Sequence, residues 1–268
     1  MKKVLAGILA LMVYGPGLAS AEVVGREVDY RAGGAAFKGY LAWDDALRGK
    51  RPGVLVVHEW WGHNAYARKR ARMLAGLGYV ALAVDMYGEG RQASHPGDAS
   101  KFSSAVMNDL PAAEARFLAA YRLLQRQPQV DPGRIAAIGY CFGGGVVLAM
   151  ARRGVALDGV VSFHGSLMAG APAQPGKVIA RVLVLNGADD PFVTAEQRAA
   201  FKRDMAQAGV TYEMIDYPGA THSFTNPDAD RLGKQFQLPL AYSARADQES
   251  WNKMQEFFRQ IFSRPAGH

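Results

Sequence analysis

The single cysteine of the 268-residue chain, Cys141, lies in the segment Gly-Tyr-Cys-Phe-Gly, residues 139–143. Glycines two places before and after a nucleophile are typical of a sharp strand-to-helix turn, because small residues let neighbouring backbone pass close by. Such a turn exposes the side chain at a helix N-terminus, where N–H groups and the helix dipole favour a thiolate. Cys141 is therefore a candidate nucleophile, and a core cysteine beside a glycine-rich helix start is the alternative.

An acid and a histidine follow the cysteine along the chain, each after an apolar segment that is expected to be a strand. Asp190 comes after the segment RVLVLNG, and His222 comes after TYEMIDYPG. In a nucleophile–acid–histidine triad, Asp190 would orient His222, and His222 would carry protons for Cys141. We favour Asp190 over Asp189 as the acid, because Asp190 lies further into the loop and is followed by proline.

Two other segments resemble a zinc-binding motif and a phosphate-binding loop, but neither has the spacing or residues that such a site requires. The segment HEWWGH, residues 58–63, has one residue too many for the zinc motif His-Glu-x-x-His. It is also expected at a strand end, where its two histidines would not share a face. The glycines after Cys141 lack the Gly-Lys-Ser/Thr ending of a phosphate loop. We therefore expect neither a metal ion nor a cofactor.

The elements that must position these residues alternate between strand and helix patterns after an antiparallel pair that turns at Gly33-Gly34. This order predicts a mostly parallel sheet with helices on both faces, in one domain spanning residues 22–268. In such a sheet, functional residues collect at the carboxyl ends of the strands. Strands are expected at 53–60, 79–88, 134–140, 157–165, 181–190 and 211–219, and helices at 65–79, 98–127, 142–154, 194–209 and 241–262. The helical segment over 98–127 is expected to be interrupted, because Asn108 or Asp109 can cap a new helix that takes Pro111 into its first turn. Thr194 is the expected cap of the helix over 194–209.

Composition favours a soluble enzyme over a nucleic-acid-binding protein. Apolar residues make up 49% and charged residues 21% of the chain, which is ordinary for a globular protein with a real core. The net charge is +7, but the basic residues are scattered. Their densest group, Arg68, Lys69, Arg70 and Arg72, is interpreted as a solvated helix face because no nucleic-acid motif accompanies it. We expect a small-molecule substrate, no nucleic-acid partner and a monomeric chain.

The N-terminus has the organisation of a secretory signal peptide over residues 1–21. Lys2 and Lys3 precede a mainly apolar run, and Ala19-Ser20-Ala21 supplies the small residues of a cleavage site. Cleavage after Ala21 would send the protein to the periplasm or outside the cell. The run is short for a membrane span, so we expect no stable membrane insertion after cleavage, with an uncleaved anchor as the weaker alternative.

Five segments, HEWWGHN, AVDMYG, GYCFGGG, GADDPFV and HSFTNPDA, stand in the order found in the dienelactone hydrolase family of α/β-hydrolases. The chain resembles this family from about Gly25 to the terminal helix. The resemblance implies an α/β-hydrolase fold and cofactor-free cleavage of a small lactone or ester. It also implies a Cys-His-Asp triad formed by Cys141, His222 and Asp190.

The resemblance implies three further roles near the nucleophile. Glu59 matches the family's glutamate beside the resting thiol, which helps to move its proton when substrate binds. The backbone N–H groups of Phe142 and Trp60 would form the oxyanion hole. From the residues alone, a carboxylate at the end of the neighbouring strand could hydrogen-bond the thiol, and a structural acid paired with an arginine is the alternative.

The chain departs from the family where dienelactone-cleaving members hold the substrate carboxylate with two arginines. Glu89 and Asn226 occupy those two positions here. Arg91 lies close to the first position and is the candidate replacement, although losing a bidentate arginine is not a conservative change. We place Arg91 and Asn226 among the substrate-binding candidates, together with Tyr87 and His164 as expected pocket residues.

These observations lead to one functional hypothesis and two alternatives. The hypothesis is a hydrolase that cleaves a small dienelactone-like lactone or ester through a thioester on Cys141. The first alternative is a general carboxylesterase or thioesterase with the same mechanism, which the missing arginines favour. The second alternative is a non-catalytic binding protein that retains the fold, and the intact Cys141, Asp190 and His222 argue against it.

Overall fold

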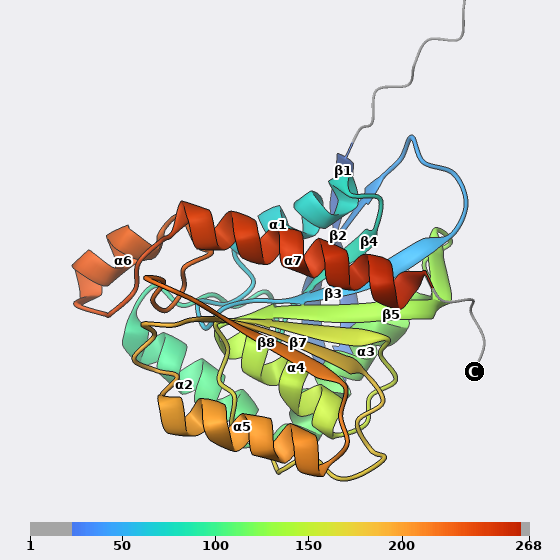
Figure 1. Ribbon diagram of the computed structural model, residues 1–268. Coiled ribbons are helices and arrows are strands. Elements are labelled where there is room, and N and C mark those ends of the chain that lie inside the picture. Colours follow the sequence, from blue (N-terminus) through green and yellow to red (C-terminus); the bar gives the residue numbers. More distant parts are fainter. Residues whose placement is uncertain (1–22, 264–268) are drawn as a thin grey trace, which may run out of the picture.

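An eight-stranded sheet runs through the middle of the computed structural model, which describes residues 23–263 (Figure 1). The predicted signal peptide, residues 1–21, lies outside the described residues. Along the sheet the strand order is β1-β2-β4-β3-β5-β6-β7-β8. The strands are β1 (Val23–Ala32), β2 (Ala35–Asp44), β3 (Arg51–Val57), β4 (Val80–Val84), β5 (Val130–Tyr140), β6 (Gly159–Phe163), β7 (Arg181–Gly187) and β8 (Tyr212–Tyr217).

Strands β3 to β8 pair in parallel, whereas β1 and β2 pair antiparallel and turn at Gly33 and Gly34. Both turn glycines have positive φ, which residues with a Cβ adopt only at a cost. The central strands are apolar on both faces because both faces are covered. The fold is thus the predicted one, a mostly parallel sheet of the α/β-hydrolase type.

Helices cover the two faces of the sheet and create two separate cores. Leu55 and Val57 of β3 point into one core, and Val54 and Val56 point into the other. Figure 1 shows α1 and α7 on one side of the sheet and α2, α4 and α5 on the other. The helices are α1 (Ala65–Gly76), α2 (Pro96–Met107), α3 (Leu110–Gln125), α4 (Phe142–Arg152), α5 (Ala195–Gln207), α6 (Ala229–Phe236) and α7 (Ala244–Phe262).

Local capping signals explain where several helices begin. The carboxylate of Asp109 accepts a hydrogen bond from the Ala112 N–H, which confirms the predicted interruption of the helical segment over 98–127 and separates α2 from α3. Thr194 caps α5 with a reciprocal capping box, as its position predicted. The terminal helix starts at Ala244 rather than Ala241, because the side chain of Ser243 provides its N-cap.

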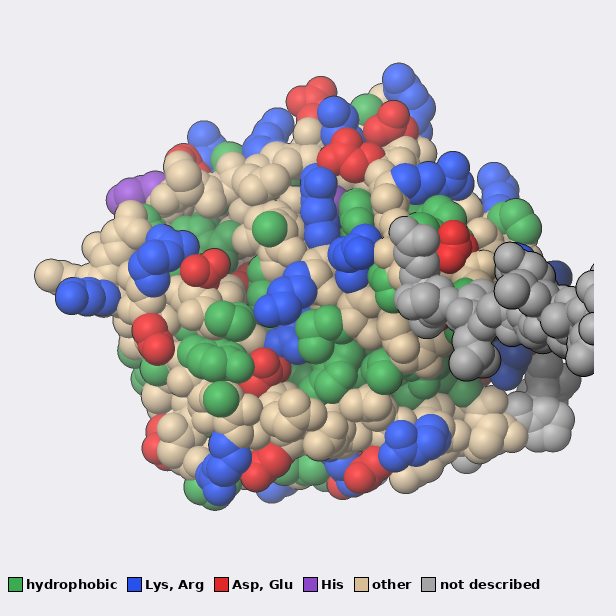
Figure 2. Space-filling view, turned by 90° about the horizontal axis from the view of Figure 1, so that it is seen from above, with side chains coloured by type: hydrophobic (Ala, Val, Ile, Leu, Met, Phe, Trp, Pro, Cys, Tyr) green, Lys and Arg blue, Asp and Glu red, His purple; other side chains and the backbone are tan. Residues whose placement is uncertain are grey.

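Positive charge is not concentrated on the face of the molecule that Figure 2 displays. Figure 2 shows basic and acidic side chains interspersed over the face that it displays. Arg70 corrects one expectation: it belongs to the basic group on α1 but is 2% exposed, and its guanidinium points into the molecule. Within residues 23–263, no helix combines the length and apolar character that crossing a membrane requires.

Candidate active site

Cys141 sits on a strained turn between β5 and α4. Its backbone has φ 53° and ψ −116°, a combination that L-residues rarely adopt. The flanking glycines permit the turn: a Cβ on Gly139 would lie 2.0 Å from the carbonyl oxygen of Gly143. A Cβ on Gly143 would lie 2.3 Å from the carbonyl oxygen of Val57. The turn therefore holds the thiol at the N-terminus of α4, as predicted from the sequence.

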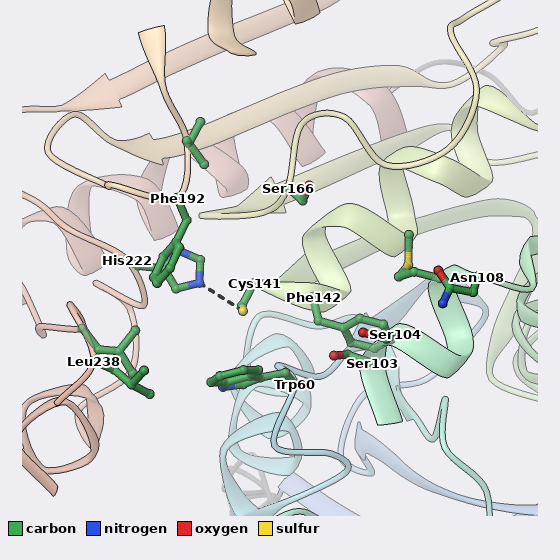
Figure 3. Close-up of a pocket in the computed structure, with 13 residues that line it drawn as sticks. Trp60, Ser103, Ser104, Asn108, Cys141, Phe142, Ser166, Phe192, His222 and Leu238 are labelled. Atoms are coloured by element: carbon green, nitrogen blue, oxygen red, sulfur yellow. Dashed lines mark hydrogen bonds between the residues drawn. The ribbon is translucent and has the colours of Figure 1, made fainter. Parts of the chain in front are cut away.

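The structure brings the three predicted triad residues together from the ends of three strands. Nε2 of His222 lies 3.0 Å from Sγ of Cys141, as the dashed line in Figure 3 marks. Nδ1 of His222 lies 2.8 Å from Oδ2 of Asp190. The other carboxylate oxygen of Asp190 accepts a hydrogen bond from the N–H of Phe192 at 2.8 Å. This is the geometry that base-assisted attack by a thiol requires.

The electrostatics of the site favour a charged histidine. Burial alone would lower the pKa of His222, but negative charge on Cys141 and the hydrogen bond that His222 donates to Asp190 outweigh it. Together they raise the pKa of His222 to about 10. An imidazolium at this position is the natural partner of a thiolate nucleophile.

Glu59 has other partners than the thiol. Its carboxylate accepts hydrogen bonds from Ser223 Oγ at 3.0 Å and from Asn226 Nδ2 at 2.6 Å. Burial raises the pKa of Glu59, and those two hydrogen bonds oppose the rise. Within the described residues no hydrogen bond joins Glu59 to Cys141, so the expected contact with the resting thiol is not made. The side-chain amide of Asn226, a substrate-binding candidate, is thus engaged with Glu59.

His164 and Tyr87 lie behind the pocket wall, which corrects their expected place on it. His164 is fully buried: Nδ1 accepts the N–H of Cys141 at 3.2 Å, and Nε2 lies 2.7 Å from Thr225 Oγ1. Burial and the nearby charge on His222 lower the pKa of His164 well below its ordinary value. The hydroxyl of Tyr87 donates to the carbonyl oxygen of Trp60 at 2.9 Å and so supports the Trp60 loop.

The two N–H groups expected to hold an oxyanion are unengaged. Within residues 23–263, no protein acceptor takes the N–H of Trp60 or that of Phe142, the first residue of α4. Both residues line the cavity that contains Cys141 and His222. They are thus available to a ligand, as an oxyanion hole requires.

Cys141 and His222 open into a cavity of about 350 Å³. Arg91 is exposed and stacks over Phe102, and it is not among the residues that line this cavity. Most of the wall was not predicted from the sequence, because its residues come from α2, from the loop at 238–240 and from positions beyond the strand-end residues that were considered. The cavity is lined by Trp60, Ser103, Ser104, Met107, Asn108, Cys141, Phe142, Ser166, Phe192, Val193, His222, Leu238 and Leu240.

The fold and the arrangement of these residues define an α/β-hydrolase. The chain belongs to the dienelactone hydrolase family, whose model matches residues 37–262. Like the members of that family, it is a hydrolase acting on a small-molecule substrate.

Three known proteins illustrate the relationship. A "Putative carboxymethylenebutenolidase" of Methylorubrum extorquens is 28% identical, over 79% of this chain and 73% of its own. A "Probable 2-oxo-3-(5-oxofuran-2-ylidene)propanoate lactonase" of Bradyrhizobium is 29% identical, over 87% and 92%. The crystal structure of a dienelactone hydrolase-like promiscuous phosphotriesterase from metagenomic libraries is 37% identical. It covers 90% of this chain and 99% of its own, with a TM-score of 0.83.

Proposed function

We propose that the protein hydrolyses a small lactone or ester through a Cys141–His222–Asp190 triad and a thioester intermediate. The observation that carries the proposal is the 3.0 Å contact between Sγ of Cys141 and Nε2 of His222 at the wall of a cavity. A lactonase and a carboxymethylenebutenolidase by name among the relatives support the reaction class.

The first half of the reaction forms the thioester. Sγ of Cys141 attacks the carbonyl carbon, and the carbonyl oxygen becomes an oxyanion held by the N–H groups of Trp60 and Phe142. One such donor typically contributes about 3 kcal/mol to stabilising the transition state. The carbon–oxygen bond to the leaving group then breaks, and His222 gives the proton on Nε2 to the leaving oxygen.

The second half consumes water. His222, now neutral, takes a proton from a water molecule, whose oxygen attacks the acyl carbon. The carbon–sulfur bond breaks and the acid is released. Cys141 returns as a thiolate opposite a protonated His222, so one water molecule is used for each acid and alcohol formed.

A specific observation favours a general carboxylesterase as the second candidate. Within the described residues, the cavity wall contains no lysine or arginine that could hold the carboxylate of a dienelactone. Asn226, at one expected arginine position, is occupied with Glu59, and Arg91 lies off the wall.

The test is kcat/KM for cis-dienelactone, trans-dienelactone and phenyl acetate, measured on the wild type and on Cys141→Ala. The proposal expects turnover that falls at least about 1000-fold in the variant. Unchanged turnover in Cys141→Ala would refute the thiol mechanism. Hydrolysis of phenyl acetate without hydrolysis of either dienelactone would select the carboxylesterase.

We also propose that the chain is exported and cleaved after Ala21. The basic, apolar and small-residue regions of residues 1–21 support this proposal. N-terminal sequencing of protein recovered from the periplasmic fraction should give Glu22 as the first residue. An N-terminus at Met1 in a cytosolic fraction would refute export.

A further inference from the structure

The cavity around Cys141 has two different sides. Figure 3 shows His222, Phe192 and Leu238 on one side of the thiol, and Ser103, Ser104 and Asn108 on the other. We call the first the histidine side and the second the α2 side. A substrate bound to Sγ must extend in both directions unless it is very small.

The histidine side is apolar and is built onto the catalytic histidine. The ring of Phe192 packs edge-on against the ring of His222 with centroids 5.0 Å apart. Leu240 forms an isolated bridge with the backbone of His222, and Leu238 lies two residues earlier on the same loop. The N–H of Phe192 is held by Asp190, so the wall and the triad share their supports.

The α2 side combines an apolar floor with neutral polar groups at its rim. The ring of Phe142 packs on Tyr87, which packs on Phe102 of α2, so this side is closed by that helix. The last turn of α2 and its C-cap present Ser104 and Asn108 to the cavity, and both are exposed to solvent. Hydroxyl and amide groups of this kind can hydrogen-bond a polar acyl chain but supply no positive charge.

The direction of the substrate follows from the chemistry of the leaving group. The leaving oxygen must lie within hydrogen-bond reach of Nε2 of His222, because that atom supplies its proton. The oxyanion must point at the N–H groups of Phe142 and Trp60. The remaining bond of the tetrahedral carbon, which carries the acyl chain, then points toward α2.

Charge narrows the substrate class further. Among the described residues lining the cavity, His222 is the only one with a side chain that becomes positively charged, and its charge is paired with Cys141 and Asp190. No acidic side chain lines the wall either. A substrate carboxylate on the histidine side would lose water against Phe192 and Leu238 without gaining a partner.

From these observations we infer that the site takes esters with an uncharged, apolar alcohol on the histidine side and the acyl group along α2. The inference rests on the proposed thiol hydrolase function and adds the orientation and the charge of the substrate. The acyl group that fits best carries a hydrogen-bonding atom that reaches Ser104 or Asn108.

The test uses two matched pairs of phenyl esters. The first pair, para-acetoxybenzoate and para-acetoxybenzamide, differs in charge on the alcohol. The second pair, monophenyl adipate and its terminal amide, differs in charge on the acyl chain. Wild-type kcat/KM should favour the amide in the first pair by about tenfold or more, because the apolar side offers the carboxylate no partner.

Arginine substitutions then assign the two sides. Leu238→Arg should raise the carboxylate-to-amide ratio of kcat/KM about tenfold for the first pair and leave the ratio for the second pair nearly unchanged. Asn108→Arg should do the reverse. Phe192→Arg and Ser104→Arg are second variants for each side, at positions whose exposure tolerates a charge. Each ratio is measured within one variant, so a general loss of activity cancels.

The outcomes separate this inference from the proposed function. If Asn108→Arg raises the carboxylate-to-amide ratio of kcat/KM for the first pair, and Leu238→Arg raises it for the second pair, the substrate is bound in the reverse orientation. That result would overturn the inference. Wild-type ratios near one for the first pair would also overturn it. If Cys141→Ala hydrolyses the ester bonds of the two amides as fast as the wild type does, the proposed function itself fails. If the wild type hydrolyses a dienelactone but neither amide, the proposed function stands and this inference is overturned.

Discussion

At the scale of single residues, Cys141, His222 and Asp190 form a row in which each polar atom has a defined partner. Asp190 uses one oxygen for His222 and the other for the N–H of Phe192. His222 uses one ring nitrogen for Asp190 and the other for Sγ of Cys141. The neutral, buried His164 lies against His222 with ring centroids 5.4 Å apart, so it adds no competing charge.

The raised pKa of His222 gives a prediction in solution. NMR titration of the imidazole should show His222 protonated up to about pH 10 in the wild type. Cys141→Ala removes the largest contribution that raises this pKa, so the pKa should fall by at least about one pH unit. Ser166→Ala is the matched control, a cavity residue without a hydrogen bond to His222. Identical titration in the wild type and Cys141→Ala would contradict the pairing.

The raised pKa of His222 also makes the free energy of unfolding depend on pH. The pKa of His222 in the folded chain lies above that of an unfolded histidine, about 6.5. Protonation of His222 therefore stabilises the fold, fully below about pH 6.5 and less as the pH rises through about 10. The triad thus contributes to the free energy of unfolding at neutral pH.

At the scale of elements, the turn between β5 and α4 depends on close backbone approach. Gly139→Ala would place a Cβ 2.0 Å from the Gly143 carbonyl oxygen, and backbone cannot move aside cheaply. We expect a loss of about 3 kcal/mol in the free energy of unfolding, measured by chemical denaturation.

Gly145→Ala is the control for that substitution. It lies on α4 itself, and its Cβ would meet its nearest neighbour, Cβ of Ala169, at 3.4 Å. Because alanine is the better helix former, we expect a change within about 1 kcal/mol. Equal destabilisation by the two variants would show that the close approach at Gly139 does not matter.

Apolar runs and capping residues in the sequence predicted most strands and helices, but not helix α6. The strands were predictable from apolar runs, and α3 and α5 from their capping residues Asp109 and Thr194. Helix α6 was missed because Asp228 makes no side-chain cap and the helix has only eight residues. Only Ala229 and Gly233 of this helix are buried, so its sequence lacks the apolar periodicity that predicts a helix.

The same limit applies to the candidate site. The triad was predictable because strand ends and the order of residues identify it. The partners of Glu59 were not, because Ser223 and Asn226 lie 164 and 167 residues away along the chain. His164 also follows a strand, but its φ of 39° turns it away from the expected path and into the core. Phe192 was also not predicted, although its position two residues after Asp190 is a signal that could have identified it.

At the scale of the whole molecule, one buried ion pair joins the parts that hold His222. Arg70 of α1 contacts Asp247 of α7 at 2.5 Å and donates to the carbonyl oxygen of Thr225 at 2.6 Å. Its guanidinium also packs against the rings of Tyr66 and Trp251. Two helices and the His222 loop are thus fixed by a single side chain.

Asp247→Asn should therefore destabilise the whole fold. The substitution leaves the Arg70 guanidinium buried without its counter-charge, which costs about 3 kcal/mol in the free energy of unfolding. Glu27→Gln is the control, because it removes the counter-charge of Arg68 in an ion pair that is more exposed to solvent. It should lower the free energy of unfolding by less than about 1 kcal/mol. Denaturant titration compares them. Similar denaturant midpoints for the two variants would mean that the ion pair between Arg70 and Asp247 contributes no more to stability than the exposed one.

The most direct test of the central claim is to trap the acyl-enzyme. The wild type is mixed with phenyl acetate, quenched in acid within the first turnovers, and analysed by intact mass and peptide mapping. We predict one added acetyl group per chain, located on Cys141 and cleaved by neutral hydroxylamine as a thioester. Steady turnover with an unmodified Cys141, or with the acetyl group on another residue, would contradict the account.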